Sequence, residues 1–543
     1  MKRKFLLVFL SAVTLLGCSD DFLNRTPQGV FTLDTYYTTT EEINTGLTYC
    51  YQAFWISEMQ SGRFMVGNMM VQDATKGGAS ENEGVDIKNN IEYNILPNTN
   101  MAYRFWSPCY TGLTRANLML EKTADKSFSE ESPAGYNYLE RMRGEMKFIR
   151  AFYSWYLVTV FGDVPYFTRA TVSNITPDLY ESVDRSVIWA QIEKDLQEAI
   201  PVLPKRLEYD ESDKGRITRG AAQMLLARTY MFNKKYDEAA VVLRDLIEND
   251  SYSLTPDYAD LFGMDVRFTS ERIFEIPFGE QEYWRTPGEG GYGTVMPQFQ
   301  TSRDDGGWGY NNPTQDLVNE FEEGDPRLIY TVICEEDQFE KGFNIGGNAR
   351  YGYHNRKIYV PLSERNPDGN LAFNLAMFRT ADAYLLYAEA SLMGTAEKNV
   401  SEAVKYINLV RQRAANSSKV DPKRYYQKMT ISDTPLPDVV YTTDEALLKA
   451  IKHERRVELA MEDIRYWDML RWGDLGTMSD YYGKWGNGTG HTDRTAPDGY
   501  PDEKGRDVKE WLARFPDGVY PVFPIPQDAV QNSDNKIKQS KYY

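Results

Sequence analysis

Residues 216–248 hold the pattern that most constrains the fold of this chain, two helical periods joined by a very short turn. Apolar residues recur there at the three- and four-residue spacing of one helix face, before and after the turn at Asn233-Lys234-Lys235. Small side chains at Ala227 and Ala239 allow the two backbones to approach closely. The segment therefore predicts an antiparallel helix pair that buries its apolar face by packing on further elements.

Two other stretches show the same kind of pattern, at 378–414 and, with a long insertion, at 104–160. The latter should end at Phe161-Gly162-Asp163-Val164-Pro165, because glycine adopts the cap conformation and proline cannot continue a helix. The spacing at 216–248 resembles a tetratricopeptide repeat, and such repeats stack into a continuous scaffold. The predicted fold is mainly α, with a tetratricopeptide-like helical scaffold at about 104–250 and 375–475 and a few short strands, among them 272–276.

Long segments without helical period separate these patterns. Residues 62–103, 279–313 and 476–520 are rich in glycine and polar residues. Loops of this length are usually either functional or disordered, and disordered segments are poor in aromatic residues. Because 279–313 is dense in aromatic residues, we predict an ordered layer of ligand-binding loops on the scaffold. This loop layer is predicted to comprise a loop-rich binding face at about 62–103 and 260–370 and a C-terminal loop region at 476–543.

The N-terminus has the layout of a secretory signal peptide. Lys2, Arg3 and Lys4 precede an apolar run, which is shorter than the roughly 20 residues that span a bilayer. The run ends at Leu15-Leu16-Gly17-Cys18, which resembles the lipobox of bacterial lipoproteins, where the chain is cut before a cysteine that is then lipidated. A plain signal peptide that contains a cysteine is the alternative. The predicted organisation is a lipoprotein signal peptide at 1–17, a lipidated tether at 18–40 and a single domain at 41–543.

Charge and cysteine usage exclude several classes of protein. The formal net charge of −18 repels nucleic acid, and no cluster of Lys or Arg offsets it, so no nucleic-acid partner is expected. Besides Cys18, the cysteines are Cys50, Cys109 and Cys334, whose wide spacing gives no CxxC metal or redox motif. At most one disulfide can form among these three, and the sequence leaves open whether two of them pair.

Motifs for catalysis are incomplete. Residues 288–293 match GxGxxG, but Pro297 stands where the helix of a dinucleotide site would have to run. His453-Glu454 begins like the zinc motif HExxH, but Val457 replaces the second histidine. The 79 acidic residues leave room for a glycosidase carboxylate pair, although no local motif marks one. We therefore predict no catalytic residues, no cofactor and no metal ligands.

The charged residues from His453 to Arg471 follow helical spacing and predict a structural network of ion pairs. Helical spacing relates Glu454 to Glu458, Arg455 to Glu462 and Arg465 to Asp468, which suggests ion pairs between helices.

Aromatic residues in the glycine-rich loops are the candidate ligand contacts. A sugar has an apolar C–H face, which aromatic rings can cover, and a rim of hydroxyls, which Asp, Asn and Arg can bind. The predicted contacts are Tyr283, Trp284, Tyr292, Trp308, Tyr310, Arg303 and Asn311 in the second loop and Asp73 in the first. The alternative is that each ring packs its loop onto the scaffold. Trp106 and Trp155 fall on helix faces and are predicted to be packing residues.

These elements, in this order, resemble the SusD/RagB family of surface lipoproteins of Bacteroidetes across nearly the whole mature chain. The early part of the match comprises Cys18, Asp21-Phe22-Leu23, Pro27, Arg143-Gly144, Arg150-Ala151, Leu157, 161–165, Ala221-Ala222 and Ala239-Ala240. The later part comprises Phe321, Asp325-Pro326-Arg327, Phe378-Arg379, Ala381-Asp382, Leu386, Ala388-Glu389-Ala390, Ile407-Asn408, 410–414, Ile451, Glu454-Arg455-Arg456, Glu458-Leu459, Glu462, Arg465, Asp468, Arg471-Trp472-Gly473 and Pro524-Ile525-Pro526.

The resemblance implies a function and a location. Members of the family are surface lipoproteins of the outer membrane that work with SusC-like TonB-dependent transporters. Ser19-Asp20-Asp21 looks like the acidic signal that exports lipoproteins to the outer face of that membrane. We therefore expect a lipid-anchored, surface-facing, non-catalytic protein that captures an oligosaccharide and delivers it to a SusC-like transporter. A RagB-like peptide-binding lipoprotein and a surface glycosidase are the alternatives, and the sequence does not name the glycan.

The anchor gives the first testable prediction. Cys18 is the only cysteine placed for lipidation, so Cys18→Ala should release the protein from the membrane fraction. Ligand affinity should be unchanged, because the anchor precedes the folded part. Fractionation of cells with immunoblotting measures the release, and a variant that stays membrane-bound would contradict the lipobox interpretation.

Overall fold

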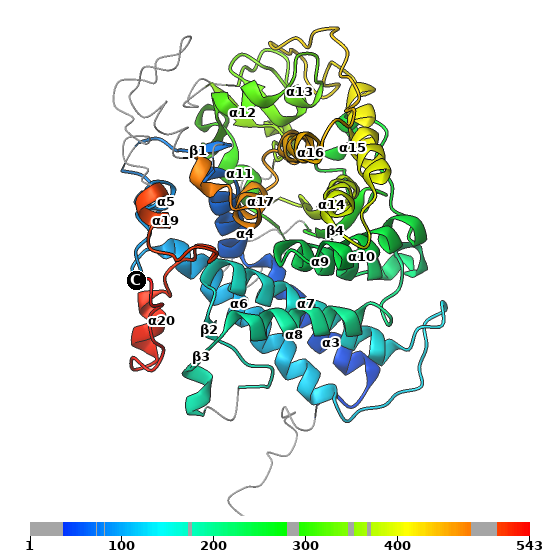
Figure 1. Ribbon diagram of the computed structural model, residues 1–543, viewed down its shortest axis with the longest axis vertical. Helices are drawn as coiled ribbons and strands as arrows, with labels where there is room; N and C mark the ends of the chain where they lie inside the picture. Colours follow the sequence, from blue (N-terminus) through cyan, green and yellow to red (C-terminus); the bar gives the residue numbers. More distant parts are fainter. Residues whose placement is uncertain are drawn as a thin grey trace, which may run out of the picture.

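The computed structural model describes residues 36–71, 73–80, 82–171, 176–279, 293–345, 352–365, 371–478 and 508–543. Within these ranges helices dominate, and the strands are short and pair two by two (Figure 1). The mainly α fold predicted from the sequence is therefore confirmed. None of the described helices combines the length and apolar character that crossing a bilayer requires.

The first half of the chain forms a group of adjacent helices. They are α3 (Thr40–Tyr51), α6 (Asn100–Thr123), α7 (Tyr138–Phe161) and α8 (Arg185–Ala199). In Figure 1 α6, α7 and α8 lie side by side, and α7 packs against both neighbours. As predicted, α7 stops at Gly162, whose φ of +72° favours glycine.

The helix pairs predicted at 216–248 and 378–414 are both present. They are α9 (Arg219–Phe232) with α10 (Tyr236–Asn249) and α14 (Thr380–Met393) with α15 (Val400–Ala415). Ala227 and Ala239 are fully buried between their helices, as their small size indicates. Because α10 packs on α14, the two pairs form one continuous helical layer. Two further helices, α16 (Asp444–Glu458) and α17 (Arg465–Trp472), complete it.

Four antiparallel strand pairs fix the intervening segments. They are β1 (Ala74–Gly77) with β5 (Tyr310–Pro313), β2 (Val164–Pro165) with β3 (Ser182–Val183), β4 (Arg272–Ile276) with β8 (Leu375–Arg379), and β6 (Val332–Cys334) with β7 (Tyr353–Asn355). The predicted strand at 272–276 is thus confirmed as β4. Short helices lie between them: α4 (Ser57–Phe64), α5 (Val85–Ile91), α11 (Met296–Gln300), α12 (Gln315–Glu320), α13 (Arg327–Thr331), α19 (Val508–Leu512) and α20 (Gln527–Asn532).

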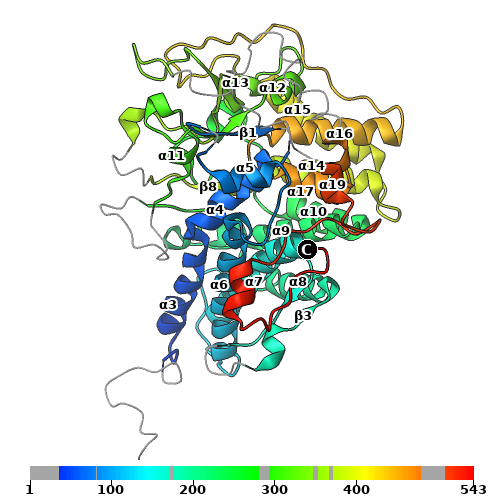
Figure 2. The ribbon, with the colours of Figure 1, turned by 90° about the vertical axis from the view of Figure 1, so that its left-hand side faces the viewer.

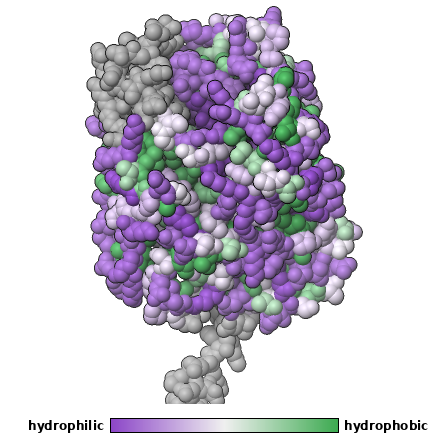
Figure 3. All heavy atoms as spheres, in the orientation of Figure 1, coloured by the Kyte–Doolittle hydropathy of each residue, from purple (hydrophilic) through white to green (hydrophobic). Residues whose placement is uncertain are grey.

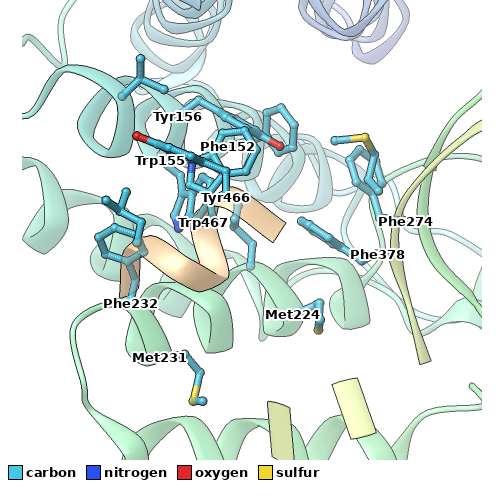
Figure 4. Close-up of a cluster of buried hydrophobic side chains, with 14 of the residues drawn as sticks. Phe152, Trp155, Tyr156, Met224, Met231, Phe232, Phe274, Phe378, Tyr466 and Trp467 are labelled. Carbon is cyan, nitrogen blue, oxygen red and sulfur yellow. The ribbon is translucent and has the colours of Figure 1, made fainter. Parts of the chain in front are cut away.

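The main core lies between α7, α9 and α17. Figure 4 shows Trp155 and Tyr156 of α7 beside Trp467 of α17, with Phe232 of α9 next to them. The Trp155 and Trp467 ring centroids are 6.0 Å apart. Trp155 is 6% exposed and Trp106 is 7% exposed, so both are packing residues, as predicted. The surface, in contrast, is mostly hydrophilic in the face that Figure 3 shows.

The structure settles the question of the cysteines within the described residues. Cys50, Cys109 and Cys334 are all buried, and no two of them are joined by a disulfide. Burial raises the pKa of the Cys50 thiol to about 12, which keeps it in its unreactive protonated form at neutral pH.

A buried ion-pair network joins the helices around Glu458, the last residue of α16. Its carboxylate accepts hydrogen bonds from Arg379 at 2.6 Å, from Arg327 at 3.0 Å and from Arg413. These residues come from β8, α13 and α15, so one carboxylate fastens three elements to α16. Burial alone would raise the pKa of Glu458, but the three guanidinium groups hold it well below its usual range.

The predicted network of ion pairs between helices is present. Arg455 binds Asp382 at 2.8 Å and Asp468 at 2.9 Å instead of Glu462. Glu462 binds Arg379 at 2.7 Å. Arg465 forms no ion pair with Asp468 or with any other described residue. Tertiary packing decides these pairings, because it brings charged residues of different helices close together.

Glu458→Gln should destabilise the protein by about 3–5 kcal/mol, because it removes the one carboxylate that three buried guanidinium groups share, although each keeps at least one other carboxylate. Chemical denaturation measures this change, and Glu211→Gln is the matched control, since the Glu211–Lys214 pair is exposed. Since the folded pKa of Glu458 is lowered, its contribution is present above the unfolded pKa and is lost as the pH falls through the folded pKa. Equal stability of the two variants would show that the network contributes nothing.

Candidate ligand-binding site

The two loops predicted to form the binding face meet in space through the β1–β5 pair. Thr75 lies opposite Asn312 in the register, and the Gly78 N–H donates a hydrogen bond of 2.8 Å to the Gly309 carbonyl. Figure 2 shows β1, α5 and α11 grouped on one side of the molecule. Residues more than two hundred positions apart thus share one surface.

Trp308 is the exposed aromatic residue of this surface. Its side chain is 38% exposed, and its ring packs edge-on against Phe299, with the ring centroids 4.3 Å apart. The backbone beside it is tightly held, because a Cβ atom at Gly307 would lie 2.2 Å from the Thr301 carbonyl oxygen. Gly309 on the other side has a φ of +74°. Trp308 is therefore fixed in place with part of its ring open to solvent.

Arg303 and Glu83 connect the two loops next to Trp308. They form an ion pair, and each side chain is 33% exposed. The second Glu83 oxygen, Oε2, accepts a hydrogen bond of 2.5 Å from the Ala79 N–H. Although partial burial opposes it, these bonds lower the pKa of Glu83. The pair therefore presents fixed, charged hydrogen-bonding groups to anything bound at this surface.

Three other predicted site residues support the surface from inside. Tyr310 is 7% exposed, with its ring centroid 6.0 Å from that of Phe299. Asn311 is buried and donates a hydrogen bond of 2.7 Å to Gln300. Asp73 is also buried and accepts a hydrogen bond of 3.0 Å from Arg456 of α16. The structure thus brings these three residues to the site, but beneath its surface.

The remaining predicted site residues lie outside the described residues. They are Trp284, Tyr283 and Tyr292 of the second loop, and Cys18 of the lipobox. The GxGxxG match at 288–293 also falls there, except for Gly293.

Sequence reasoning missed two exposed apolar side chains on the helices beside this face. Val85 on α5 is 49% exposed and Tyr103 on α6 is 45% exposed. α5 packs against both β1 and α6, which places these helices next to the joined loops. Tyr103 lies in a helix, whereas the search for ligand contacts relied on aromatic residues between glycines.

His453, the first residue of the incomplete zinc motif, is held by two carboxylates. Its Nδ1 lies 2.7 Å from a Glu320 oxygen, and its Nε2 lies 3.2 Å from a Glu322 oxygen. Burial opposes protonation, but these hydrogen bonds raise the pKa of His453 to about 9. The imidazole is therefore a cation at neutral pH, and neither nitrogen is open to a metal. In the described part of the chain, no three His, Cys, Asp or Glu side chains gather as metal ligands would.

Comparison with protein families identifies the fold. A model described as the SusD family matches residues 270–543, half of the chain. A second model, described as "Starch-binding associating with outer membrane", matches residues 21–231. The chain therefore belongs to the SusD family, and the second description associates it with the outer membrane.

Curated relatives agree with this assignment. A SusD-like protein of Bacteroides ovatus is 24% identical over 514 residues, which cover 87% of this chain and 83% of the relative. SusD-like protein P25 of Formosa agariphila is 26% identical, over 68% of this chain and 70% of the relative.

Solved structures share the fold over almost the whole chain. Surface glycan-binding protein A from Bacteroides fluxus aligns with a TM-score of 0.72 at 24% identity, covering 93% of this chain and 100% of that protein. A laminarin-binding SusD-like protein aligns at 0.69 and 25% identity, with coverages of 93% and 100%. Surface glycan-binding protein A from Bacteroides thetaiotaomicron, solved in complex with laminarihexaose, aligns at 0.69 and 20% identity, again covering 93% and 100%.

Proposed function

We propose that this protein is a surface-exposed, non-catalytic lipoprotein that binds an oligosaccharide at the β1–β5 face and delivers it to a SusC-like TonB-dependent transporter. The observation that carries the proposal is the exposed, rigidly held Trp308 ring at the point where the two loops join. Membership of the SusD family supports it, as do the similar proteins whose names state that they bind glycans.

The chemistry of this face suits a sugar. The open part of the Trp308 ring can stack on the apolar face of a pyranose, while Arg303 and Glu83 can hydrogen-bond the hydroxyls around it. Because all three groups are held by internal contacts before binding, little conformational entropy would be lost on complex formation. Preorganisation of this kind favours capture of a dilute ligand.

The same groups are poorly suited to hydrolysis. A glycosidase needs a carboxylic acid with a raised pKa to protonate the leaving group. Glu83, the carboxylate beside Trp308, instead has a lowered pKa, and both of its oxygens are engaged by Arg303 and by the Ala79 N–H. This supports binding without chemistry at the face.

Trp308→Ala should weaken glycan binding by about tenfold or more. Stacking of a nucleic-acid base on an aromatic ring contributes roughly 1–3 kcal/mol, and we take a sugar face to be comparable or somewhat weaker. Each 1.4 kcal/mol corresponds to about tenfold in affinity. The ligand would first be found on a glycan array that includes laminarihexaose, and affinity would then be measured by calorimetry. The melting temperature should change little, because the ring is partly exposed.

Trp155→Ala is the control, since this core ring should cost about 3–5 kcal/mol of stability when removed. Unchanged affinity in Trp308→Ala would contradict a binding role for this ring. Selective binding of peptides would favour the RagB-like alternative, and release of reducing ends from the bound glycan would favour a glycosidase.

Delivery to a transporter predicts a stable partner. Gentle detergent extraction of the native membrane should co-purify a TonB-dependent transporter larger than this 62.5 kDa chain. Mass spectrometry of the purified complex identifies it. Isolation of the lipoprotein alone, under conditions that preserve a known transporter complex, would count against the proposed delivery step.

A further inference from the structure

A cavity of about 520 Å³, separate from the β1–β5 face, lies beside helix α16. Figure 1 shows α16 between α12 and α15, and it packs against both. Ala446, Lys449, His453 and Arg456 follow one another at helical spacing and line the cavity from one face of α16. The small alanine side chain leaves room there, and the volume lies in the range of small-molecule sites.

The carboxylates at the bottom of this cavity are already neutralised by the protein. Glu320 binds Arg456 at 2.8 Å and Glu322 binds Arg411 at 2.9 Å. Protonated His453 bridges the two. These acidic groups therefore leave little negative charge for an added cation to bind.

Arg465, at the start of α17, is different because its guanidinium lines the cavity without a counter-ion. Among the described residues it forms no ion pair and no hydrogen bond, and its Nε is buried without a partner. Its guanidinium lies 5.9 Å from the centre of the Trp472 ring. Burial, together with the nearby positive charge of Arg456, lowers the pKa of Arg465. The Arg465 side chain is half-buried, and the carboxylates that act on it electrostatically, Asp73, Asp468 and Glu320, are each bound by another arginine.

Two further groups complete a chemically defined site. Lys449 is exposed at the rim and forms no ion pair with a described residue. Trp472 contributes its ring, which is fixed by a hydrogen bond of 2.9 Å from its indole N–H to Glu389. The cavity thus offers two cations that have no ion-pair partner among the described residues.

We propose that this cavity is a second ligand site, which binds an anionic sugar through a carboxylate or sulfate that pairs with Arg465. The planar guanidinium can bind either group through two parallel hydrogen bonds. Lys449 adds a second positive charge at the entrance, and Trp472, with Lys452 4.8 Å and Arg471 4.7 Å from the centre of its ring, forms part of the wall. This site extends the protein's function beyond the glycan binding proposed for the β1–β5 face, since its ligand is selected by charge.

Calorimetry on the full mature protein at low salt tests the proposal with two pairs of probes. Trigalacturonate is compared with its methyl ester, and glucose 6-sulfate with glucose. We expect saturable binding of at least one anionic probe, no binding of its neutral counterpart, and weaker binding as salt is added. The pair that responds decides between carboxylate and sulfate.

Arg465→Met should weaken binding of the anionic probe by tenfold or more, and Lys449→Ala should weaken it less. The Arg465→Met variant should melt at the same or a higher temperature without ligand, because an apolar side chain removes the desolvation cost of a half-buried charge that has no ion-pair partner among the described residues. Lys194→Ala, which removes an exposed lysine of α8, is the matched control and should have no effect. Trp308→Ala should also leave anion binding intact, which separates this site from the loop face.

Three results would overturn the proposal. One is the absence of binding by both anionic probes. Another is binding that Trp308→Ala removes and Arg465→Met does not, because the anionic sugar would then occupy the loop face. The third is a loss of stability in Arg465→Met comparable to that of Glu458→Gln, which would show that Arg465 is a structural residue.

Discussion

The buried charges of α16 are the interaction on which the rest of the structure depends. Four of its last five residues, Glu454, Arg455, Arg456 and Glu458, form ion pairs with other parts of the chain. Glu454 holds Arg327 and Arg411, Arg455 holds Asp382 and Asp468, and Glu458 holds Arg379, Arg327 and Arg413. Such pairs gain little net energy over apolar packing, but removal of one partner is costly. They therefore determine which helices can pack around α16.

The fourth residue, Arg456, carries this constraint to the binding face. It binds Asp73, whose carbonyl in turn accepts a hydrogen bond of 3.0 Å from the Thr314 N–H. Asp73 directly precedes β1 and Thr314 directly follows β5, so the scaffold fixes both strands at one end of their ladder. Trp308 and the Arg303–Glu83 pair lie at the other end. The loops are thus ordered by a charge buried in the helical layer, although they contain little regular structure of their own.

Local and non-local interactions explain what the sequence could predict. Helices α7, α9, α10, α14 and α15 were predictable because spacing, caps and turns lie within the segment that folds. The pairing of β1 with β5 was not, since it depends on contacts across more than two hundred residues. For the same reason, the sequence could place Asp73 and Asn311 at the site but could not show that both are buried beneath its surface. Ion pairs between helices could be expected around Arg455, but its partners Asp382 and Asp468 could not be named, because packing between helices sets them.

Arg465 has no ion-pair partner among the described residues, although its own helix, α17, could have supplied one. Asp468 lies one turn further along the same helix, at the spacing that usually gives an ion pair. It is instead held by Arg455 at 2.9 Å and by Arg471 at 2.9 Å. The neighbouring arginines are therefore satisfied, while Arg465 keeps its charge facing a cavity beside Trp472. An uncompensated charge costs stability unless something binds it, and an anionic ligand is the chemistry that this arrangement leaves open.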